Sequence, residues 1–139
     1  MQCTLPILRF LGVFLMMLVS CQTSSTTKYA GGIALSFDDL FLEEWHELRP
    51  LFKQYDARVT FYITCDTLTE HQRQLIQNLQ SDGHEIGFHG TIHGNARQMI
   101  KSLGTEGFIK TEIDPGMQYL RSIGIHPKSY AHPGGNNTN

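Results

Sequence analysis

Residues 32–39 read GIALSFDD, an almost continuous apolar run that ends in two adjacent aspartates. Apolar runs of this length are typical of strands that are covered on both faces, as in a parallel sheet. A second stretch, HGTIH at residues 89–93, also follows a short apolar run. Two imidazoles and one carboxylate would form a three-ligand metal site that leaves a position for water, as in hydrolytic zinc centres. The second aspartate could then act as the base that takes a proton from this water.

Strands and helices are expected to alternate along the rest of the chain. Thr67 and Glu70 have the spacing of a capping box at the start of a helix, and Gly83 fits the position just after its end. Pro50 and Pro115 are expected to bend the helices that contain them. The expected strands are 32–37, 58–64, 85–88 and 128–131, and the expected helices are 41–55, 67–81 and 105–123. Repeated strand–helix units predict an α/β fold with a parallel sheet, whose ligands usually lie beyond the carboxyl ends of the strands.

The candidate functional residues lie at these expected strand ends. Asp38 and Asp39 follow the first strand, His89 follows the third, and His132 follows the fourth. Because the chain turns at a strand end, both carboxylates can reach one cavity although strand neighbours normally point to opposite faces. On a helical turn, His89 and His93 would share one face. Alternatively, the aspartates only cap the following helix, and the histidines are exposed or internally bonded.

Together these motifs resemble the polysaccharide deacetylase family. The shared pattern is SFDD, then HxxxH about fifty residues later, then a Pro-Gly-Gly turn after a strand, and it covers about residues 31–135. The family includes chitooligosaccharide, chitin and peptidoglycan deacetylases and some acetylxylan esterases. The resemblance implies a distorted (β/α) barrel with a divalent metal, usually zinc, at the strand ends.

The resemblance also implies a role for each candidate residue. Asp38 is similar in position to the family's catalytic base. The residues similar to the metal ligands are Asp39, His89 and His93. The residues expected to line the substrate groove are His132, Pro133 and Gly134. His132 is also a candidate for the general acid.

Three features depart from the family pattern. Gly90 stands where the family usually has Ser or Thr, and Thr91 follows it. The turn at residues 131–135 reads AHPGG instead of Arg-x-Pro-aromatic-Gly, so the arginine that helps to orient the base is absent. The chain stops at Asn139, before the later strands that carry the family's general-acid histidine. We therefore expect a barrel that is truncated after about four strands, with low activity.

The resulting functional prediction is a zinc-dependent hydrolase that removes acetyl groups from N-acetylated or O-acetylated carbohydrate polymers or oligosaccharides. It would act on carbon–nitrogen bonds other than peptide bonds. One alternative is a non-catalytic carbohydrate-binding lipoprotein with the same fold. Another is a non-haem iron oxygenase, because two histidines and one carboxylate also describe its metal site. Oxygenases of this kind are mostly antiparallel β folds, so the strand–helix alternation disfavours them.

The N-terminus predicts export. Residues 1–20 resemble a signal peptide, because their apolar core of about ten residues is shorter than the roughly 20 that cross a bilayer. Ser20 before Cys21 resembles the bacterial lipobox, in which cleavage leaves a lipidated cysteine. Residues 21–30 would then be the lipidated cysteine and a flexible tether, and 31–139 a partial catalytic domain. We expect a membrane-anchored bacterial lipoprotein, periplasmic or on the cell surface; an ordinary secretory signal or a short membrane anchor is the alternative.

Composition sets broader limits on function. Hydrophobic residues make up 40% of the chain and charged residues 17%, which is typical of a globular protein. The formal net charge is −2 and Lys and Arg form no basic run, which argues against a nucleic-acid partner.

Overall fold

The computed structural model describes residues 31–135 of the chain. The expected signal peptide, Cys21 and the tether lie outside the described residues, so these predictions stay open. The chain divides into two units, Met1–Gly32 and Ile33–Asn139, and every described helix and strand belongs to the second. Within the described part, no helix has the length and apolar character needed to cross a bilayer.

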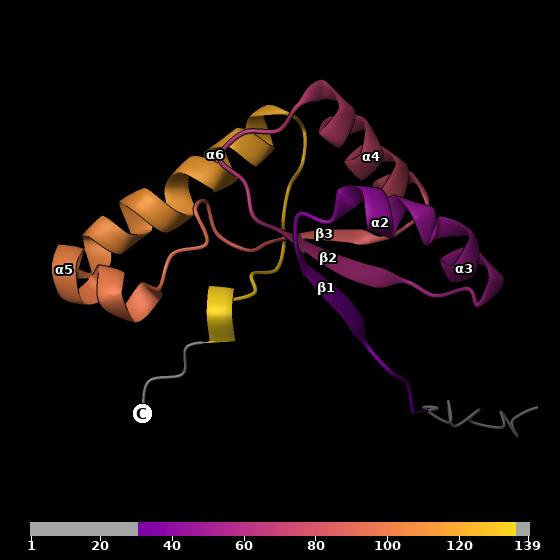
Figure 1. The fold of residues 1–139 in the computed structure, drawn as a ribbon, viewed down its shortest axis with the longest axis horizontal. Coiled ribbons are helices and arrows are strands. Elements are labelled where there is room, and N and C mark those ends of the chain that lie inside the picture. The colour runs from indigo at the N-terminus through magenta and orange to yellow at the C-terminus, as the bar shows by residue number, and fades with distance from the viewer. Residues whose placement is uncertain (1–30, 136–139) are drawn as a thin grey trace, which may run out of the picture. The chain divides into compact units, whose positions relative to one another are not determined.

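Three parallel strands form the sheet in the order β1-β2-β3 (Figure 1). Their bounds are β1 Leu35–Asp39, β2 Val59–Ile63 and β3 Glu85–Phe88. A helical connection joins each strand to the next, which confirms the predicted α/β class with a parallel sheet. All three strands end at the same edge, so the residues that follow them are brought close together.

The predicted fourth strand is reduced to a single parallel bridge between Phe88 and Tyr130. The Phe88 N–H donates to the Ser129 carbonyl and the Ala131 N–H donates to the Phe88 carbonyl, each at 3.0 Å. The prediction of a full strand at 128–131 was wrong. The backbone of the segment pairs only with the last residue of β3, which has four residues in all, and beyond it the chain turns into the His89 loop.

β1 is less covered than its apolar sequence predicts. Leu35 is 45% exposed and Ile33, just before the strand, is 89% exposed. Within the described residues β1 pairs only with β2, and Phe37 alone packs on the core from this strand. The expectation of burial on both faces was therefore wrong for β1, although β2 does bury Val59 and every second residue after it.

The first predicted helix is divided in two. α2 (Leu42–Glu47) and α3 (Arg49–Gln54) meet at Leu48, and Pro50 lies in the first turn of α3. A proline is tolerated there because the N–H that it lacks would have no partner within the helix. The bend that Pro50 predicted is confirmed.

The second predicted helix is α4 (Glu70–Ser81), which ends at the predicted residue. Its capping box uses Thr69 with Gln72 instead of Thr67 with Glu70, so the predicted cap was displaced by two residues. Gly83 has φ +86°, the left-handed conformation expected just beyond a helix end.

The third helical stretch begins earlier than predicted. α5 (Ala96–Phe108) continues through a π-helical segment, η1 (Ile109–Ile113), into α6 (Asp114–Ser122). The prediction missed residues 96–104. Their apolar residues, Ala96, Met99, Ile100 and Leu103, do have helical spacing, but Ala96 alone is buried there. The predicted start coincides with Gly104, whose φ of 71° interrupts the helix. The predicted bend near Pro115 corresponds to the π-helical segment just before it.

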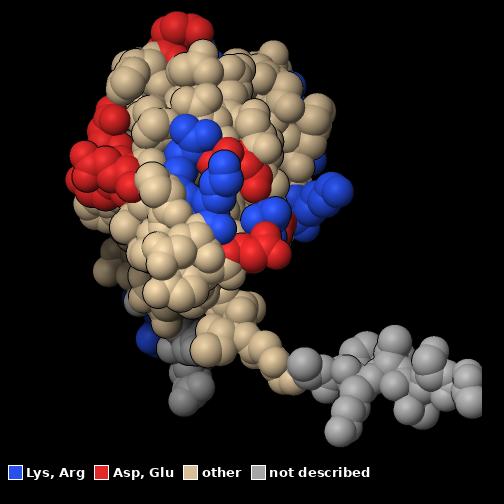
Figure 2. Space-filling model, turned by 90° about the vertical axis from the view of Figure 1, so that its right-hand side faces the viewer, with Lys and Arg blue, Asp and Glu red and all other residues tan. Residues whose placement is uncertain are grey.

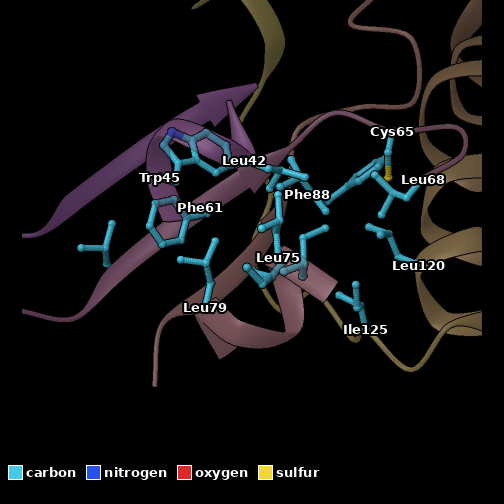
Figure 3. Packing of buried hydrophobic residues seen from close by; sticks show 14 of the residues in the cluster. Leu42, Trp45, Phe61, Cys65, Leu68, Leu75, Leu79, Phe88, Leu120 and Ile125 are labelled. Atoms are coloured by element: carbon cyan, nitrogen blue, oxygen red, sulfur yellow. The ribbon is translucent and has the colours of Figure 1, made fainter. Parts of the chain in front are cut away.

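The core lies where helices α2, α3, α4 and α6 pack against the sheet (Figures 1 and 3). Phe61 of β2 is its centre, with the Trp45 ring centroid at 4.8 Å and that of Phe37 at 5.7 Å. α4 contributes Leu75, Ile76 and Leu79 to the same cluster. Because Phe61 is fully buried, this packing holds the central strand rigidly and with it the strand ends.

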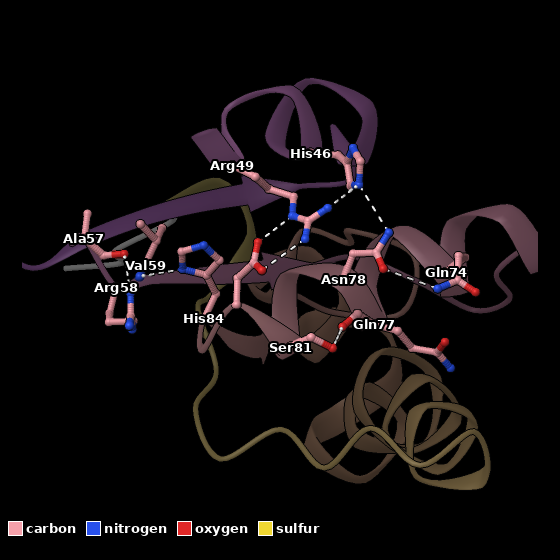
Figure 4. Close-up of polar contacts among 11 residues, drawn as sticks. His46, Arg49, Ala57, Arg58, Val59, Gln74, Gln77, Asn78, Ser81 and His84 are labelled. Carbon is pink, nitrogen blue, oxygen red and sulfur yellow. Dashed lines mark hydrogen bonds and ion pairs between the residues drawn. The ribbon is translucent and has the colours of Figure 1, made fainter. Parts of the chain in front are cut away.

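A polar network links α2 and α3 to α4 on the outer side of this core (Figure 4). Arg49 donates to both carboxylate oxygens of Asp82 and to Nε2 of His46, which also accepts from Asn78. A cavity of about 300 Å³ opens beside it, lined by Arg49, Lys53, Asp56, Arg58, Asp82 and His84. Figure 2 shows Lys and Arg gathered on one face with Asp and Glu beside them. We regard this cluster as structural, since two of its three basic groups already pair with carboxylates.

We expect Asp82→Asn to lower the free energy of unfolding by about 0.5–1 kcal/mol, because it breaks a bidentate pair that solvent partly screens. The hydrogen bond from Arg49 holds the pKa of Asp82 below its ordinary value of 3.8. The carboxylate therefore stabilises the fold fully above that value and loses its contribution as the pH falls through the lowered pKa. Thermal melts of both proteins from pH 7 to pH 2 test this. A gap in Tm that stayed constant down to pH 2 would contradict the pairing.

Candidate metal centre

Asp39 is the last residue of β1 and has φ +82°, an uncommon value for a residue other than glycine. Its carbonyl accepts the Thr64 N–H at 3.2 Å, which ties the turn to the end of β2. This left-handed turn breaks the alternation of the strand, so Asp39 need not point away from the face that Asp38 occupies. The capping alternative is not observed, since the N-cap of α2 is Phe41 and no side chain caps that helix.

His89 follows β3 directly and is 3% exposed. Its N–H donates to the Ile63 carbonyl at 2.9 Å, and the Thr64 hydroxyl donates to its carbonyl at 3.3 Å. Nδ1 of the ring lies 2.9 Å from the Ala131 carbonyl oxygen. A carbonyl can only accept, so this geometry assigns the proton to Nδ1 and leaves Nε2 with a free lone pair. Metal-binding histidines are held in the same way.

Asp39, His89 and His93 converge on one point. Oδ1 of Asp39 lies 3.7 Å from Nε2 of His89 and 3.3 Å from Nε2 of His93. One ligand atom from each residue lies within 4.8 Å of the others. Donor atoms about 2.0–2.2 Å from a tetrahedral zinc ion are separated by roughly 3.3–3.6 Å. The three side chains therefore fit a single divalent ion after only small movements.

His93 reaches this point through an irregular turn. The predicted helical turn at residues 89–93 is not formed, and His93 has φ +55°. The turn folds back at Gly90, whose φ is +96°. A residue with a side chain would not fit at this position, because its Cβ atom would lie 2.2 Å from Oε1 of Glu112. The backbone, not a helical repeat, brings the two histidines together.

No role was predicted for Glu112, which is fully buried. Its carboxyl oxygens accept the backbone N–H groups of Ile92 at 3.2 Å and Gly94 at 2.9 Å, on either side of His93. A signal did exist, because Glu112 stands next to Ile113 in a helix whose apolar residues pack on the core. A charged residue among apolar helix positions is seldom buried without a specific partner.

The remaining candidates lie around this centre without joining the three-residue cluster. Asp38 is exposed and is paired in register with Tyr62 of β2. His132 is partly buried, and its Nδ1 lies 3.3 Å from the Tyr130 hydroxyl. Partial burial, assisted by the charge of Glu112, raises the pKa of Tyr130.

The two other residues expected in the groove differ in environment. Pro133 is buried, and its Cγ lies 3.1 Å from where a Cβ of Gly90 would be, so the turn at 133–135 packs directly on the histidine loop. Gly134 is exposed, with φ +71°. Pro133 thus packs against the histidine loop, and Gly134 is the residue of this turn that is accessible to solvent.

Solved structures with similar folds include a carbohydrate esterase and a peptidoglycan deacetylase. A family 4 carbohydrate esterase from Streptomyces lividans, solved with acetate, has a TM-score of 0.62 and 21% identity, covering 78% of this chain and 54% of its own. The peptidoglycan deacetylase PdaC from Bacillus subtilis has a TM-score of 0.59 and 20% identity, covering 76% of this chain and 50% of its own. At these identities the likeness shows the fold, and it confirms the predicted (β/α)-barrel type.

Sequence comparison extends this result. The uncharacterized protein YlxY of Bacillus subtilis is 27% identical over 94 residues, which cover 67% of this chain and 28% of YlxY. The chain thus spans about half the length of the solved structures above and less of YlxY. The family model for polysaccharide deacetylase matches residues 26–139, most of the chain. The chain belongs to the polysaccharide deacetylase family.

Proposed function

We propose that this chain carries the metal centre of a hydrolase that removes acetyl groups from N-acetylated or O-acetylated carbohydrate. The observation that supports this most is the convergence of Asp39, His89 and His93 within 4.8 Å. Two of the three non-glycine residues with positive φ in residues 31–135 are Asp39 and His93. Unfavourable backbone conformations of this kind are concentrated at functional sites.

Zinc is the metal that best fits the donor set. Two imidazoles and a carboxylate are borderline ligands that suit it, and the protonated Nδ1 of His89 directs the lone pair of Nε2 towards Asp39. A bound zinc ion would supply Lewis-acid chemistry, by lowering the pKa of water and polarising the acetyl carbonyl. The parallel sheet disfavours the iron oxygenase alternative.

Asp38 is the proposed catalytic base. It would accept a proton from the attacking water as the water oxygen bonds to the acetyl carbon. The bond from that carbon to the sugar nitrogen or oxygen then breaks, and the leaving group takes up a proton. His132 is the candidate donor of this proton. An alcohol leaves more readily than an amine, so esters should be cleaved faster than amides where the acid is weak.

The exposure of the centre suits a polymeric substrate. The side chains of Asp39 and His93 are 48% and 43% exposed, whereas His89 is enclosed. A sugar chain can therefore approach the open side while His89 stays fixed from behind. PdaC, a fold relative, is a peptidoglycan deacetylase, and we propose an acetylated polysaccharide or oligosaccharide as the partner of this chain.

The test of this proposal measures metal and turnover separately. The metal-free chain is titrated with Zn²⁺ and Fe²⁺ by calorimetry, and acetate release is followed with N-acetylated chitooligosaccharide and with acetylated xylan. We expect one zinc ion per chain and zinc-dependent acetate release. Zinc binding without acetate from either substrate would support the non-catalytic carbohydrate-binding alternative, and a preference for iron would support the oxygenase.

We also propose that the protein is an exported lipoprotein attached to the membrane through Cys21. Lipid chains contribute about 0.8 kcal/mol for each buried CH₂ group, and a diacylated anchor therefore binds stably. In Cys21→Ser we expect the protein to leave the membrane fraction or to accumulate as an uncleaved precursor. Fractionation with mass determination of the N-terminal peptide measures this, and Cys3→Ser is the matched control. A processed Cys21→Ser protein that stays on the membrane would refute the lipid anchor.

A further inference from the structure

Glu112 is a buried carboxyl group whose hydrogen bonds all go to one turn. It is 0% exposed, and each of its two oxygens accepts one backbone N–H, from Ile92 and from Gly94. No Lys, Arg or His among residues 31–135 forms an ion pair with it. Burial of an unpaired carboxyl group is costly, so these two amides are the compensation that the described structure provides.

The two amides flank His93. Its φ of +55° is a conformation that costs roughly 1–2 kcal/mol for an L-residue. Such a conformation persists only where its surroundings hold it. The bonds from Glu112 hold the Thr91–Ile92 peptide group and the His93–Gly94 peptide group, and they thereby set the direction of a side chain that is itself 43% exposed.

Thr91 ties the same turn to the helix that carries Glu112. Its N–H and its hydroxyl both donate to the Glu112 carbonyl at 2.9 Å. The hydroxyl also accepts the Gly116 N–H at 3.0 Å. Thr91 stands one place after the position where the family pattern has its hydroxyl, and here that hydroxyl binds the turn to the π-helical segment.

The π-helical segment η1 explains how Glu112 reaches inward. A π-helical turn inserts an extra residue into a helix and rotates the side chains that follow, and such turns are frequent at functional sites. Here the segment ends at Ile113, directly after Glu112, and Pro115 follows in the first turn of α6. The helix thus places one polar side chain under the metal centre while Ile113 packs on the core.

We propose that Glu112 is the positioning residue for the metal ligand His93. It acts through the backbone amides of Ile92 and Gly94 and does not touch the ion. The inference rests on the proposed function in so far as His93 binds metal. The arrangement of the turn itself can be measured without metal, so the two ideas can fail separately.

The decisive variant is Glu112→Gln, which keeps the shape of the side chain. One acceptor oxygen becomes an NH₂ group, so one of the two backbone N–H groups loses its partner. Changes in groups that orient metal ligands typically cost about 10–100-fold in metal affinity. We expect the zinc Kd to rise by about this factor, and the visible spectrum of the Co²⁺-substituted protein to change. In the metal-free protein, amide exchange at Ile92 and Gly94 should accelerate.

Two controls separate positioning from stability. Glu106→Gln makes the same exchange at an exposed site six residues earlier, where Glu106 pairs with Lys110, and should change none of these readouts. Asp82→Asn lowers stability far from the turn and should leave zinc affinity unchanged.

A second variant at the tested position, Glu112→Asp, keeps both carboxyl oxygens but shortens the side chain. It should give a smaller loss of zinc affinity than Glu112→Gln.

Each outcome decides the proposal. If Glu112→Gln melts lower but keeps wild-type zinc affinity and wild-type exchange at Ile92 and Gly94, Glu112 is only a structural residue and the inference is overturned. If the wild-type chain binds no zinc, the proposed function fails, and amide exchange alone decides whether Glu112 holds the turn. If Glu112→Gln does not fold, Glu112→Asp takes its place, and wild-type affinity and exchange in that variant overturn the inference.

Discussion

In an Asp38→Asn variant we expect zinc affinity to stay unchanged while zinc-dependent acetate release falls by about 10²–10⁴-fold, the usual contribution of a general base. Asp38 lies outside the cluster that Asp39, His89 and His93 form. An asparagine preserves the shape of the side chain but cannot take a proton at neutral pH. Calorimetric titration and initial rates of acetate release, measured on the same preparation, test both halves of this expectation.

His93→Ala should give the opposite pattern and lose the metal itself. Removal of a direct ligand should exceed the roughly 10–100-fold loss that follows from changes in groups that only orient ligands. His71→Ala is the matched control, because His71 is an exposed histidine that pairs with Glu43 on the surface. If Asp38→Asn abolished zinc binding, Asp38 would belong to the ligand set and the assignment of base and ligand would be reversed.

The sequence predicted the parts of this fold that depend on apolar pattern and turn chemistry. β3 was placed at its observed residues, and β2 lacked only the first and last of those expected. Glycine after a helix also located an end correctly, because Gly83 adopts the left-handed conformation that other residues avoid. Parallel strands have their carboxyl ends at the same edge of the sheet. For this reason Asp39 and His89, fifty positions apart, could be expected to lie close together.

The remaining features depend on contacts between residues distant in sequence, which short sequence patterns do not predict. The left-handed turns at Asp39 and His93 are held by bonds to residues distant in sequence, such as the bond from Thr64 to the Asp39 carbonyl. Glu112 acts on a turn about twenty residues before it. The exposure of β1 depends on which strands lie beside it, whereas its composition indicates only that it is apolar.

The early part of α5 shows a different limit. Residues 96–103 bury almost nothing, and their helix is stabilised locally by Asn95, whose side chain accepts the Gln98 N–H at 3.0 Å. Ala96, Met99, Ile100 and Leu103 recur at helical spacing, so the pattern was present in the sequence although only Ala96 is buried. A search for caps would have found Asn95.

Gly90→Ser should lower the free energy of unfolding by about 2–5 kcal/mol, although serine is a residue that the family pattern usually carries at this place. The φ of +96° costs an L-residue roughly 1–2 kcal/mol. The new Cβ would also lie 2.2 Å from Oε1 of Glu112, and such overpacking typically costs about 1–3 kcal/mol. Because the displaced carboxyl group would release the turn at His93, zinc affinity should fall as well.

Gly124→Ser separates backbone strain from this steric contact. Gly124 has φ +83°, and a Cβ there would meet nothing within 4 Å, so only the strain of about 1–2 kcal/mol is expected. Denaturant unfolding of the two variants compares them directly, and calorimetry reports zinc affinity. Equal losses of stability in both, with zinc affinity intact in Gly90→Ser, would mean that Glu112 moves aside freely. The close fit between Gly90 and Glu112 would then have no part in holding His93. A larger loss in Gly90→Ser, with weakened zinc binding, would show that this chain needs glycine there because the carboxyl group occupies the space of a side chain.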